Sequence, residues 1–427
     1  MKVWLVNPFD PLPGGDEQLG RYAHLAEALI GAGHQVTWFS STFSHRFKRD
    51  VDRESVQQAS AKQGIALRLV ATRPYKTNVS IARLRSHRAY GRAFLRMARD
   101  ESPPDIILAS SPPLESARAA SDLGQRWDIP TIIDIQDQWP DNFAAVLPPV
   151  FKVCGKVLLA PWYAAERAAY RNATGIVGVA EGYVERGLSV GGAKRYQGVF
   201  PLGVSVSELD GAIARGAASF AGKWSKGNGQ FRLLYSGSLS HNYDFLTIIR
   251  AAAQLRDAGD DRIEFVLSGT GELAEEGRKL VAAHRLENVT LTGFLDFDEW
   301  AYLLSQSDAG FNASFPDALI YLPNKIFYYM AAGLAVLNTI PGECARLVTE
   351  SECGLNYEAG DVGGCVEAIR TLVGARDRMA AMGEASRRLA VERFDRRIVS
   401  GRFVEFLTNV VRDRRGEASS SGGGDGA

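Results

Sequence analysis

A lysine at the expected start of a short helix is the residue of this chain best suited to chemistry on an anionic substrate. The segment 322–338 predicts a loop, a helix beginning near Asn324, a stop at Gly333 and a buried strand. The first N–H groups of a helix lack intrahelical partners and carry the positive end of its dipole, so they favour a phosphate. Lys325 would add a mobile positive charge there. An ordinary strand–helix unit with a surface lysine is the alternative interpretation of this segment taken alone.

Four short apolar strands precede this helix and would position it. They are expected within residues 231–239, 263–272, 289–295 and 309–314, and the first three end in glycine-containing turns. Alternating strands and helices imply a parallel sheet, whose ligands bind outside the carboxyl ends of the strands. Glycine at those ends lets the backbone approach a bound group closely.

The first half of the chain predicts another α/β unit of the same kind. Its strands are expected at residues 3–6, 35–39, 65–70, 106–109 and 131–135. A chain of 427 residues is too long for one typical core, so two domains are expected. Near the end, residues 396–412 have helical apolar spacing. Residues 416–427 are rich in Gly and Ser and predict a flexible tail.

Composition restricts the partners and the compartment. The 49 Lys and Arg residues balance 49 Asp and Glu residues, so no global field selects nucleic acid. Four cysteines without C-x-x-C spacing, and no secretory signal, favour reduced thiols in a cytoplasm. No stretch approaches ~18 uncharged apolar residues, so a spanning helix is not expected.

The segment Arg73–Arg99 is locally basic, with eight Lys or Arg residues and no acid. On a helix, five arginines form one stripe: Arg85, Arg88, Arg92, Arg96 and Arg99. Apolar area comes from Ile81, Leu84, Phe94, Leu95 and Met97. Such a helix fits an anionic membrane surface or a diphosphate-linked lipid, and a solvated helix face is the alternative. Residues 151–163 could form a second membrane-facing element or a buried interdomain helix.

Several motifs together resemble a known family. In the second half these are Tyr235-Ser-Gly-Ser-Leu239, Leu267-Ser-Gly-Thr-Gly-Glu272 and Leu322-Pro-Asn-Lys325 followed by Met330-Ala-Ala-Gly333. In the first half they are Pro11-Leu-Pro-Gly-Gly15 before Arg21, Gly33-His-Gln-Val-Thr37, Ile107–Pro113 and Asp134–Pro140. Their order and spacing over roughly residues 1–400 resemble the retaining GT-B glycosyltransferases of family 4, in the subgroup that builds bacterial surface polysaccharides.

The resemblance implies an α/β protein of the GT-B fold, with two Rossmann-like domains facing a deep cleft. Residues 1–200 would form the acceptor-binding domain and residues 201–395 the nucleotide-sugar donor domain. Residues 396–415 would be a helix crossing back to the N-terminal domain, before the tail at 416–427. The implied reaction moves a sugar from a nucleotide diphosphate sugar, a UDP-sugar, to a saccharide or a polyprenyl-diphosphate-linked saccharide. The implied location is cytoplasmic, peripheral on the cytoplasmic face of the inner membrane.

The resemblance also implies which residues bind the donor. They are Gly15, Gly237, Ser238, Gly269, Thr270, Gly271, Phe294, Leu295, Asn324, Lys325, Ile326 and Tyr328. Lys325 would stabilise the leaving diphosphate, since fixed donors around developing charge usually supply most of the catalysis. Arg85, Arg88 and Arg92 would face the acceptor or the membrane.

Asp137 is the best acidic candidate near the acceptor. It follows the strand at 131–135 and could orient the acceptor hydroxyl or take its proton. A helix cap beside Trp139 is the alternative. His87 and His241 could make polar contacts, or be ordinary core and surface histidines.

Two departures from the family pattern leave an alternative function open. Two glutamates usual in the family fall on Ile320 and Tyr328 here, and Asp317 could replace one of them. An inactive GT-B scaffold that partners another transferase would account for the missing acids. A dinucleotide oxidoreductase would need G-x-G-x-x-G after the first strand, and residues 7–15 lack it.

The second departure concerns the phosphate site. The Arg and Lys usual after the first donor strand fall on Ser238 and on Asn242 or Tyr243, so Lys325 would take over their role. The pair Asp296 and Asp298 resembles a metal-binding D-x-D, but Asp directly before an apolar-periodic helix is expected as a cap. No metal or other cofactor is therefore expected.

Overall fold

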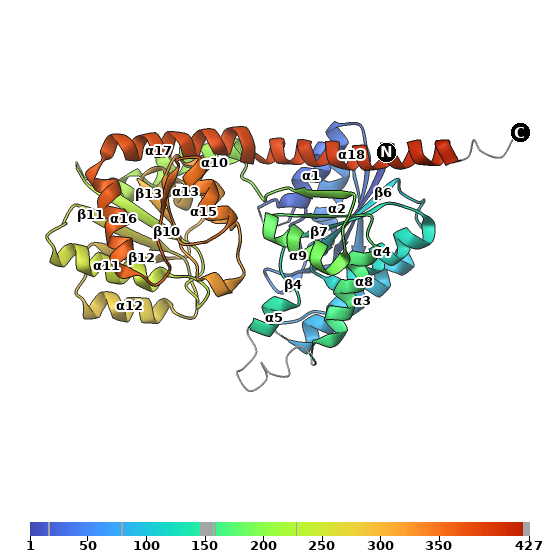
Figure 1. The fold of residues 1–427 in the computed structure, drawn as a ribbon, viewed down its shortest axis with the longest axis horizontal. Helices are drawn as coiled ribbons and strands as arrows, with labels where there is room; N and C mark the ends of the chain where they lie inside the picture. The colour runs from blue at the N-terminus through green and yellow to red at the C-terminus, as the bar shows by residue number, and fades with distance from the viewer. Residues whose placement is uncertain (16–17, 78–79, 146–156, 158, 228, 422–427) are drawn as a thin grey trace, which may run out of the picture. The chain divides into compact units, whose positions relative to one another are not determined.

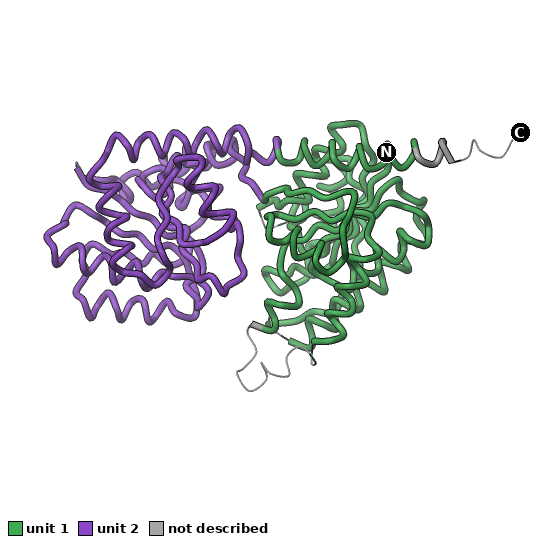
Figure 2. Tube along the Cα trace, in the orientation of Figure 1, with its two compact units in different colours: residues 1–201, 399–427 green, residues 202–398 purple. Residues whose placement is uncertain are grey.

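The computed structural model describes residues 1–15, 18–77, 80–145, 157, 159–227 and 229–421. The chain forms two compact units. Unit 1 contains residues 1–201 and 399–427, and unit 2 contains residues 202–398 (Figure 2). No helix in the described part of the chain is long and apolar enough to cross a membrane.

Unit 1 is built on a seven-stranded parallel sheet with the order β5-β2-β1-β6-β7-β8-β9 (Figure 1). The strands are β1 (Lys2–Val6), β2 (Gln35–Ser41), β5 (Ile65–Val70), β6 (Ile106–Ser111), β7 (Thr131–Ile135), β8 (Gly175–Gly178) and β9 (Tyr196–Val199). The five expected strands are confirmed. The sequence analysis missed β8 and β9, because they are short and contain glycine, which is depleted in strands.

Helices surround this sheet, and a short hairpin follows β2. The helices are α1 (Arg21–Gly31), α2 (Arg53–Lys62), α3 (Ile81–Ala98), α4 (Leu114–Trp127), α5 (Asp141–Ala145), α8 (Ala160–Asn172) and α9 (Glu181–Gly191). The hairpin consists of β3 (Phe43–Ser44) and β4 (Arg49–Asp50). Phe94 of α3 packs edge-on against Trp4 and Phe39, with centroids 6.4 and 5.0 Å away. Phe94 is fully buried, so the expectation that it offers apolar surface is wrong.

The last helix, α18 (Arg396–Ser421), joins unit 1 from Val399 onward. Val399, Phe403, Leu407 and Val410 recur at helical spacing and enter the core of unit 1. Phe403 stacks on Phe200 with ring centroids 4.2 Å apart. A flexible tail is expected from residue 416, but α18 continues to Ser421 because Glu417 and Ala418 extend a helix that packing has already fixed. Residues 422–427 lie outside the described part.

Unit 2 is built on a six-stranded parallel sheet with the order β12-β11-β10-β13-β14-β15. The strands are β10 (Phe231–Ser236), β11 (Ile263–Ser268), β12 (Val289–Gly293), β13 (Ala309–Asn312), β14 (Ala335–Asn338) and β15 (Gly354–Asn356). In Figure 1, α11 and α16 lie on one side of these strands and α10 and α13 on the other. Helices on both faces explain why β10, β13 and β14 are fully buried.

Eight α-helices and two shorter helices belong to unit 2 in the described part of the chain. They are α10 (Val206–Trp224), α11 (Phe245–Asp257), α12 (Ala274–Ala283), α13 (Phe297–Ser305), α14 (Asn324–Ala331), α15 (Glu343–Glu350), α16 (Val362–Gly374) and α17 (Arg376–Leu389), with short helices at Pro316–Ala318 and Ala390–Phe394. The predicted helix start at Asn324 is confirmed, and Gly333 takes a positive φ of 74° directly after the helix.

Candidate active site

The strand orders indicate where a ligand would bind in each unit. When its strands are numbered from β10, the sheet of unit 2 has the Rossmann order 3-2-1-4-5-6. The chain adds strands on one side of β10 first and then on the other side, beginning with β13, so the switch point lies between β10 and β13. In unit 1 the reversal falls between β1 and β6. A doubly wound sheet binds ligands outside the carboxyl ends of its strands at such a switch point. A ligand of unit 2 is therefore expected beside the residues that follow β10 and β13.

Lys325 lies at this switch point. It is the second residue of α14, which follows β13, and its Nζ lies over the ring of Tyr235 near the end of β10. Its Nζ lies 4.2 Å from the ring centroid of Tyr235 and 4.5 Å from that of Tyr243. The same Nζ would be 3.2 Å from a Cβ atom placed on Gly237.

The ammonium of Lys325 is enclosed but has no hydrogen-bond partner among the described residues. Burial lowers the pKa of Lys325 to about 7, from a usual value near 10.5. The two tyrosine rings supply cation–π attraction, which only partly replaces lost water. A buried ammonium is costly unless an anion accepts its hydrogen bonds. An anionic ligand within hydrogen-bonding distance of this Nζ would stabilise its charged form.

The helix end beside Lys325 adds to this preference. Pro323 is the N-cap of α14 and offers no side-chain acceptor to the first N–H groups, and no acid lies in the first turn. Asn324 is exposed, while Ile326 packs inside. Ile326 N donates to Pro323 O at 3.3 Å, and the positive end of the helix dipole favours the same negative charge as Lys325.

The glycine turns of unit 2 have a structural reason that the sequence does not show. A Cβ on Gly269 would lie 1.7 Å from the carbonyl oxygen of Gly237, and one on Gly271 would lie 2.3 Å from that of Leu239. Gly237 N donates to Ser268 O at 2.9 Å. These glycines let the turns after β10 and β11 pack against each other. Ser238 and Thr270 remain exposed beside them.

An aromatic cluster lies near the start of α13. Tyr328 is only 7% exposed, and its ring centroid lies 5.0 Å from that of Trp300. Trp300 donates its Nε1–H to Ser236 Oγ at 2.8 Å. Tyr328 therefore has little surface left for a ligand. Phe294, in contrast, is 73% exposed after β12, and Leu295 is half-buried beside it.

The sequence analysis missed a ladder of asparagines at the carboxyl ends of three strands. Asn312, Asn338 and Asn356 are the last residues of β13, β14 and β15 and lie directly opposite one another. Asn312 donates to Asn338 at 2.8 Å, and Asn338 donates to Asn356 at 2.7 Å. This ladder fixes the strand ends beside α14. The sequence contains a signal that could have predicted this ladder, namely three short apolar segments that each end in Asn.

The acidic candidates of unit 2 have other partners. Asp296 is the N-cap of α13 and accepts from Glu299 N, which confirms the expected cap. Asp298 forms an ion pair with Arg215 at 2.7 Å. Asp317 is exposed on the short helix at 316–318. His241 is exposed, with its ring 4.0 Å from Glu272.

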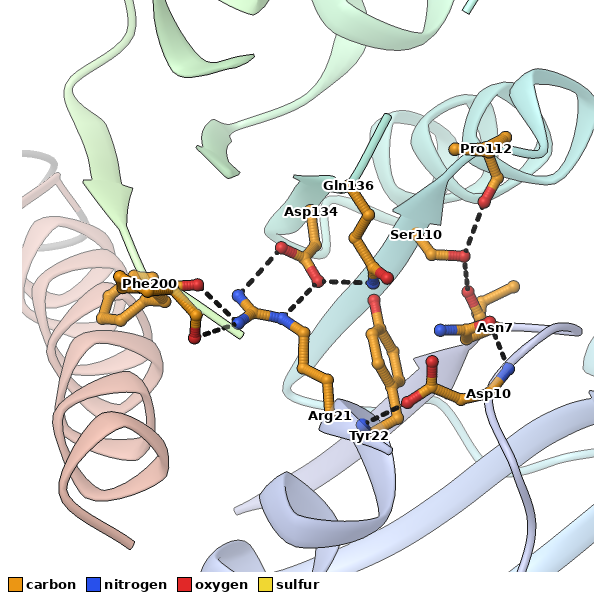
Figure 3. A network of polar contacts seen from close by, with 11 residues as sticks. Asn7, Asp10, Arg21, Tyr22, Ser110, Pro112, Asp134, Gln136 and Phe200 are labelled. Atoms are coloured by element: carbon orange, nitrogen blue, oxygen red, sulfur yellow. Dashed lines mark hydrogen bonds and ion pairs between the residues drawn. The ribbon is translucent and has the colours of Figure 1, made fainter. Parts of the chain in front are cut away.

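Unit 1 has a buried ion pair at the carboxyl end of its sheet (Figure 3). Arg21, the first residue of α1, forms a two-pronged contact with Asp134 of β7, at 2.9 and 3.0 Å. Its other nitrogen donates to the carbonyl oxygens of Phe200 and Pro201. The guanidinium also lies 5.0 Å from the ring of Phe403. Arg21 thereby connects three parts of unit 1. These are strand β7, the backbone at Phe200 and Pro201, and helix α18.

Asp137 lies in the loop after β7, as expected, and is half-buried. Its carboxylate accepts hydrogen bonds from Gln138 N at 2.9 Å and from the side chain of Asn142. Burial raises the pKa of Asp137. It precedes α5 by a turn, so it shapes that turn but is not the cap residue.

His87 lies in a neighbouring aromatic cluster. Its ring is 5.3 Å from Trp139 and 5.4 Å from Phe9, and neither ring nitrogen has a hydrogen-bond partner among the described residues. Burial lowers the pKa of His87 well below its usual value, so the ring is neutral.

The loop with Gly15 packs on α2, where Ser55 donates to Gly14 O at 2.8 Å. It lines a cavity of about 120 Å³.

The arginine stripe of α3 is confirmed as a surface feature. Arg85, Arg88, Arg92, Arg96 and Arg99 are all exposed. Arg88 lies 5.6 Å from the ring of Trp162 and 3.9 Å from Glu115. The predicted membrane-facing segment 151–163 lies mostly outside the described residues.

Two doubly wound parallel sheets in one chain are the arrangement of the GT-B class of fold. The family model for the glycosyl transferase 4-like domain matches residues 19–203. The model for glycosyl transferases group 1 matches residues 230–375. The two matches together show that the chain is a glycosyltransferase, and its expected fold class is confirmed.

Solved structures agree in fold. The Anabaena protein Alr3699/HepE in complex with UDP is 14% identical with a TM-score of 0.67, over 96% of this chain and 100% of that chain. Sucrose-phosphate synthase from Thermosynechococcus elongatus is 17% identical with a TM-score of 0.70, over 96% and 99%. WaaG, a glycosyltransferase involved in lipopolysaccharide biosynthesis, is 14% identical with a TM-score of 0.64, over 96% and 100%. No curated protein matches the chain in sequence.

Proposed function

We propose that this glycosyltransferase moves a sugar from a UDP-sugar, with retained configuration, to a saccharide or a polyprenyl-diphosphate-linked saccharide in cell-surface polysaccharide assembly. One observation carries the donor part of the proposal. The enclosed ammonium of Lys325 lacks a hydrogen-bond acceptor and stands at the switch point of unit 2. A diphosphate supplies that acceptor. The complexes of Alr3699/HepE with UDP and with UDP-glucose support a uridine nucleotide.

The leaving diphosphate is the charge that catalysis must stabilise. Lys325 would bind it by an ion pair, and the first N–H groups of α14 would add fixed donors. Gly237, Ser238, Gly269, Thr270 and Gly271 would surround it with backbone and hydroxyl groups. Phe294 and Leu295 would contact the base and ribose, with Phe294 offering an exposed ring. No metal ion is required in this proposal.

The acceptor would bind to unit 1. Asp137 would orient the acceptor hydroxyl or receive its proton, and its raised pKa suits a proton acceptor better than an ordinary aspartate. Arg85, Arg88 and Arg92 would face a lipid-linked acceptor or an anionic membrane. The protein would then act at the cytoplasmic face of the inner membrane. WaaG supports the pathway by analogy of fold alone.

A first experiment separates this function from an inactive scaffold. Purified protein is titrated with UDP-, GDP- and dTDP-sugars by calorimetry, with and without EDTA, and turnover is measured with a saccharide acceptor. We expect saturable binding of one UDP-sugar, turnover, and no effect of EDTA. Binding without turnover for any acceptor would favour the scaffold. The anomeric configuration of the product, read by NMR, tests retention directly.

A further inference from the structure

Two cationic side chains of unit 1 converge on one buried tyrosine. The hydroxyl of Tyr75, which precedes α3, hydrogen-bonds His45 Nδ1 at 2.5 Å. Arg83 of α3 also forms a side-chain hydrogen bond with Tyr75. Lys48 Nζ lies 3.3 Å from His45 Nδ1 and donates to the carbonyl oxygen of the same histidine. The ammonium of Lys48 and the guanidinium of Arg83 therefore meet at the His45–Tyr75 pair, and we call these four residues the cation cluster.

Aromatic rings line the cation cluster at the ligand-binding end of the sheet. The guanidinium carbon of Arg83 lies 4.5 Å from the ring of Trp139 and 5.7 Å from that of Phe9. Lys48 Nζ lies 5.0 Å from the ring of Tyr75. Phe9 follows β1 and Trp139 follows β7, so both rings stand beyond the carboxyl ends of strands in unit 1. A doubly wound sheet binds its ligands there.

The cation cluster combines two cations with little negative charge. Burial lowers the pKa of Lys48, and the neighbouring charge of Arg83 lowers it further. Burial, with both of these cations, lowers the pKa of His45 to about 3, so its ring is neutral. The acid whose charge acts on Arg83 is Asp137, and burial raises the pKa of that carboxyl. An anionic ligand would stabilise both desolvated cations.

A buried histidine beside the cation cluster has unused hydrogen-bonding capacity. His87 of α3 is 2% exposed, and neither of its ring nitrogens has a hydrogen-bond partner within the described ranges. Its ring centroid lies 5.3 Å from that of Trp139, 5.4 Å from that of Phe9 and 6.4 Å from that of Tyr75. Buried polar atoms without partners are uncommon. Aromatic rings with a few convergent polar groups are typical of a site for a polar organic ligand.

We propose that the cation cluster binds an acidic group, a carboxylate or a phosphate ester, on the sugar that accepts the transferred residue. Arg83 and Lys48 would form charge-assisted hydrogen bonds with its oxygens. Trp139, which contacts Arg83, lies two residues after Asp137, the residue proposed above to act on the acceptor hydroxyl. The inference rests on the proposed transfer to a saccharide, and it names the class of that saccharide as acidic.

The test measures binding of three small probes without any donor. The probes are the methyl glycosides of glucuronic acid, of glucose 6-phosphate and of glucose, and ligand-observed NMR gives their dissociation constants. The full-length protein carries Lys325→Met, so that the donor site attracts no anion. We expect at least one acidic glycoside to bind at least ~10-fold more tightly than the neutral one, because hydrogen bonds between charged groups are the stronger ones. The acidic probe that binds more tightly distinguishes a carboxylate from a phosphate ester.

Variants of the cation cluster assign the preference to its residues. In the Lys325→Met protein, Arg83→Met should remove the preference for the acidic probe, and Lys48→Met, at a less buried position, should reduce it. Arg83→Lys keeps the charge and should retain part of the preference. Arg96→Met changes an exposed arginine further along α3 and should bind all probes like its parent. Thermal melting of each variant checks the fold.

Three results would overturn the inference. These are equal binding of the acidic and neutral glycosides, no binding of either acidic glycoside, and an unchanged preference in both Arg83→Met and Lys48→Met. Because no donor is present, a failure here leaves the transfer of a sugar from a UDP-sugar untouched. A protein that prefers the acidic probe but binds no UDP-sugar would instead contradict the proposed donor.

Discussion

Binding of a sugar nucleotide should take up a proton, and the proton should go to Lys325. Burial lowers the pKa of Lys325 to about 7 in the free protein. A bound diphosphate stabilises the ammonium and raises that pKa again. At pH 8 roughly one-tenth of the free protein carries the charge, so binding should take up ~0.9 proton. The affinity for the sugar nucleotide should be highest below pH 7. It should fall roughly tenfold for each pH unit above 7, until the pH reaches the pKa of Lys325 in the complex.

Calorimetry measures this uptake. UDP-glucose is titrated at pH 8 in buffers of different protonation enthalpy, and the slope of observed heat against that enthalpy gives the number of protons. The diphosphate of UDP-glucose is fully ionised in this range and adds none. In Lys325→Arg the cation is permanent, so uptake should vanish while binding persists. Lys279→Ala, at an exposed site on α12, should behave like wild type. Zero uptake in wild type, or equal uptake in Lys325→Met, would refute the reasoning.

Four further predictions follow from the same geometry. Lys325→Ala should lower sugar-nucleotide turnover at least ~10²-fold, the scale for one lost charge-stabilising donor, and unchanged turnover would remove its assigned role. Asp137→Asn should lower kcat by ~10²-fold or more with little change in Tm, whereas a lower Tm with normal kcat would make the residue structural. Arg21→Met leaves the buried carboxylate of Asp134 unpaired and should cost about 3–5 kcal/mol in urea unfolding, while a loss under ~1 kcal/mol would contradict the buried pair. Gly269→Ala would force a Cβ to 1.7 Å from a neighbouring carbonyl, so both donor affinity and Tm should fall, and wild-type values of both would refute that contact.

The sequence was sufficient for the features whose signals are local. Apolar segments located most strands of both sheets, with β8, β9 and β15 missed, and Asp296 before a periodic helix gave its cap. The start of α14 at Asn324 could be predicted because Pro323 precedes it and apolar spacing follows. Each of these signals spans a few residues, so no knowledge of the tertiary structure was required.

The environment of the site could not be predicted, since it is made by residues far apart in the chain. Lys325 is enclosed by Tyr235 and Tyr243, which follow from strand order and not from spacing. The role of Gly269 depends on the neighbouring turn, so its sequence context suggested ligand approach alone. Phe94 was expected to add apolar surface to α3, and only the packing of α3 on the sheet shows that it is buried.

The hairpin of β3 and β4 shows a further limit of sequence patterns. Each of its strands has two residues, too few for an alternation to be recognised. The sequence does not show which element the hairpin packs against. The contact between His45 and Tyr75 places it beside the segment that leads into α3.

A structure of the protein with UDP bound tests the central claim most directly. The account predicts a diphosphate oxygen within ~3 Å of Lys325 Nζ, beside the turn at Gly237 and the first N–H groups of α14. A nucleotide bound elsewhere, with the ammonium still enclosed by Tyr235 and Tyr243 and unpaired, would contradict it.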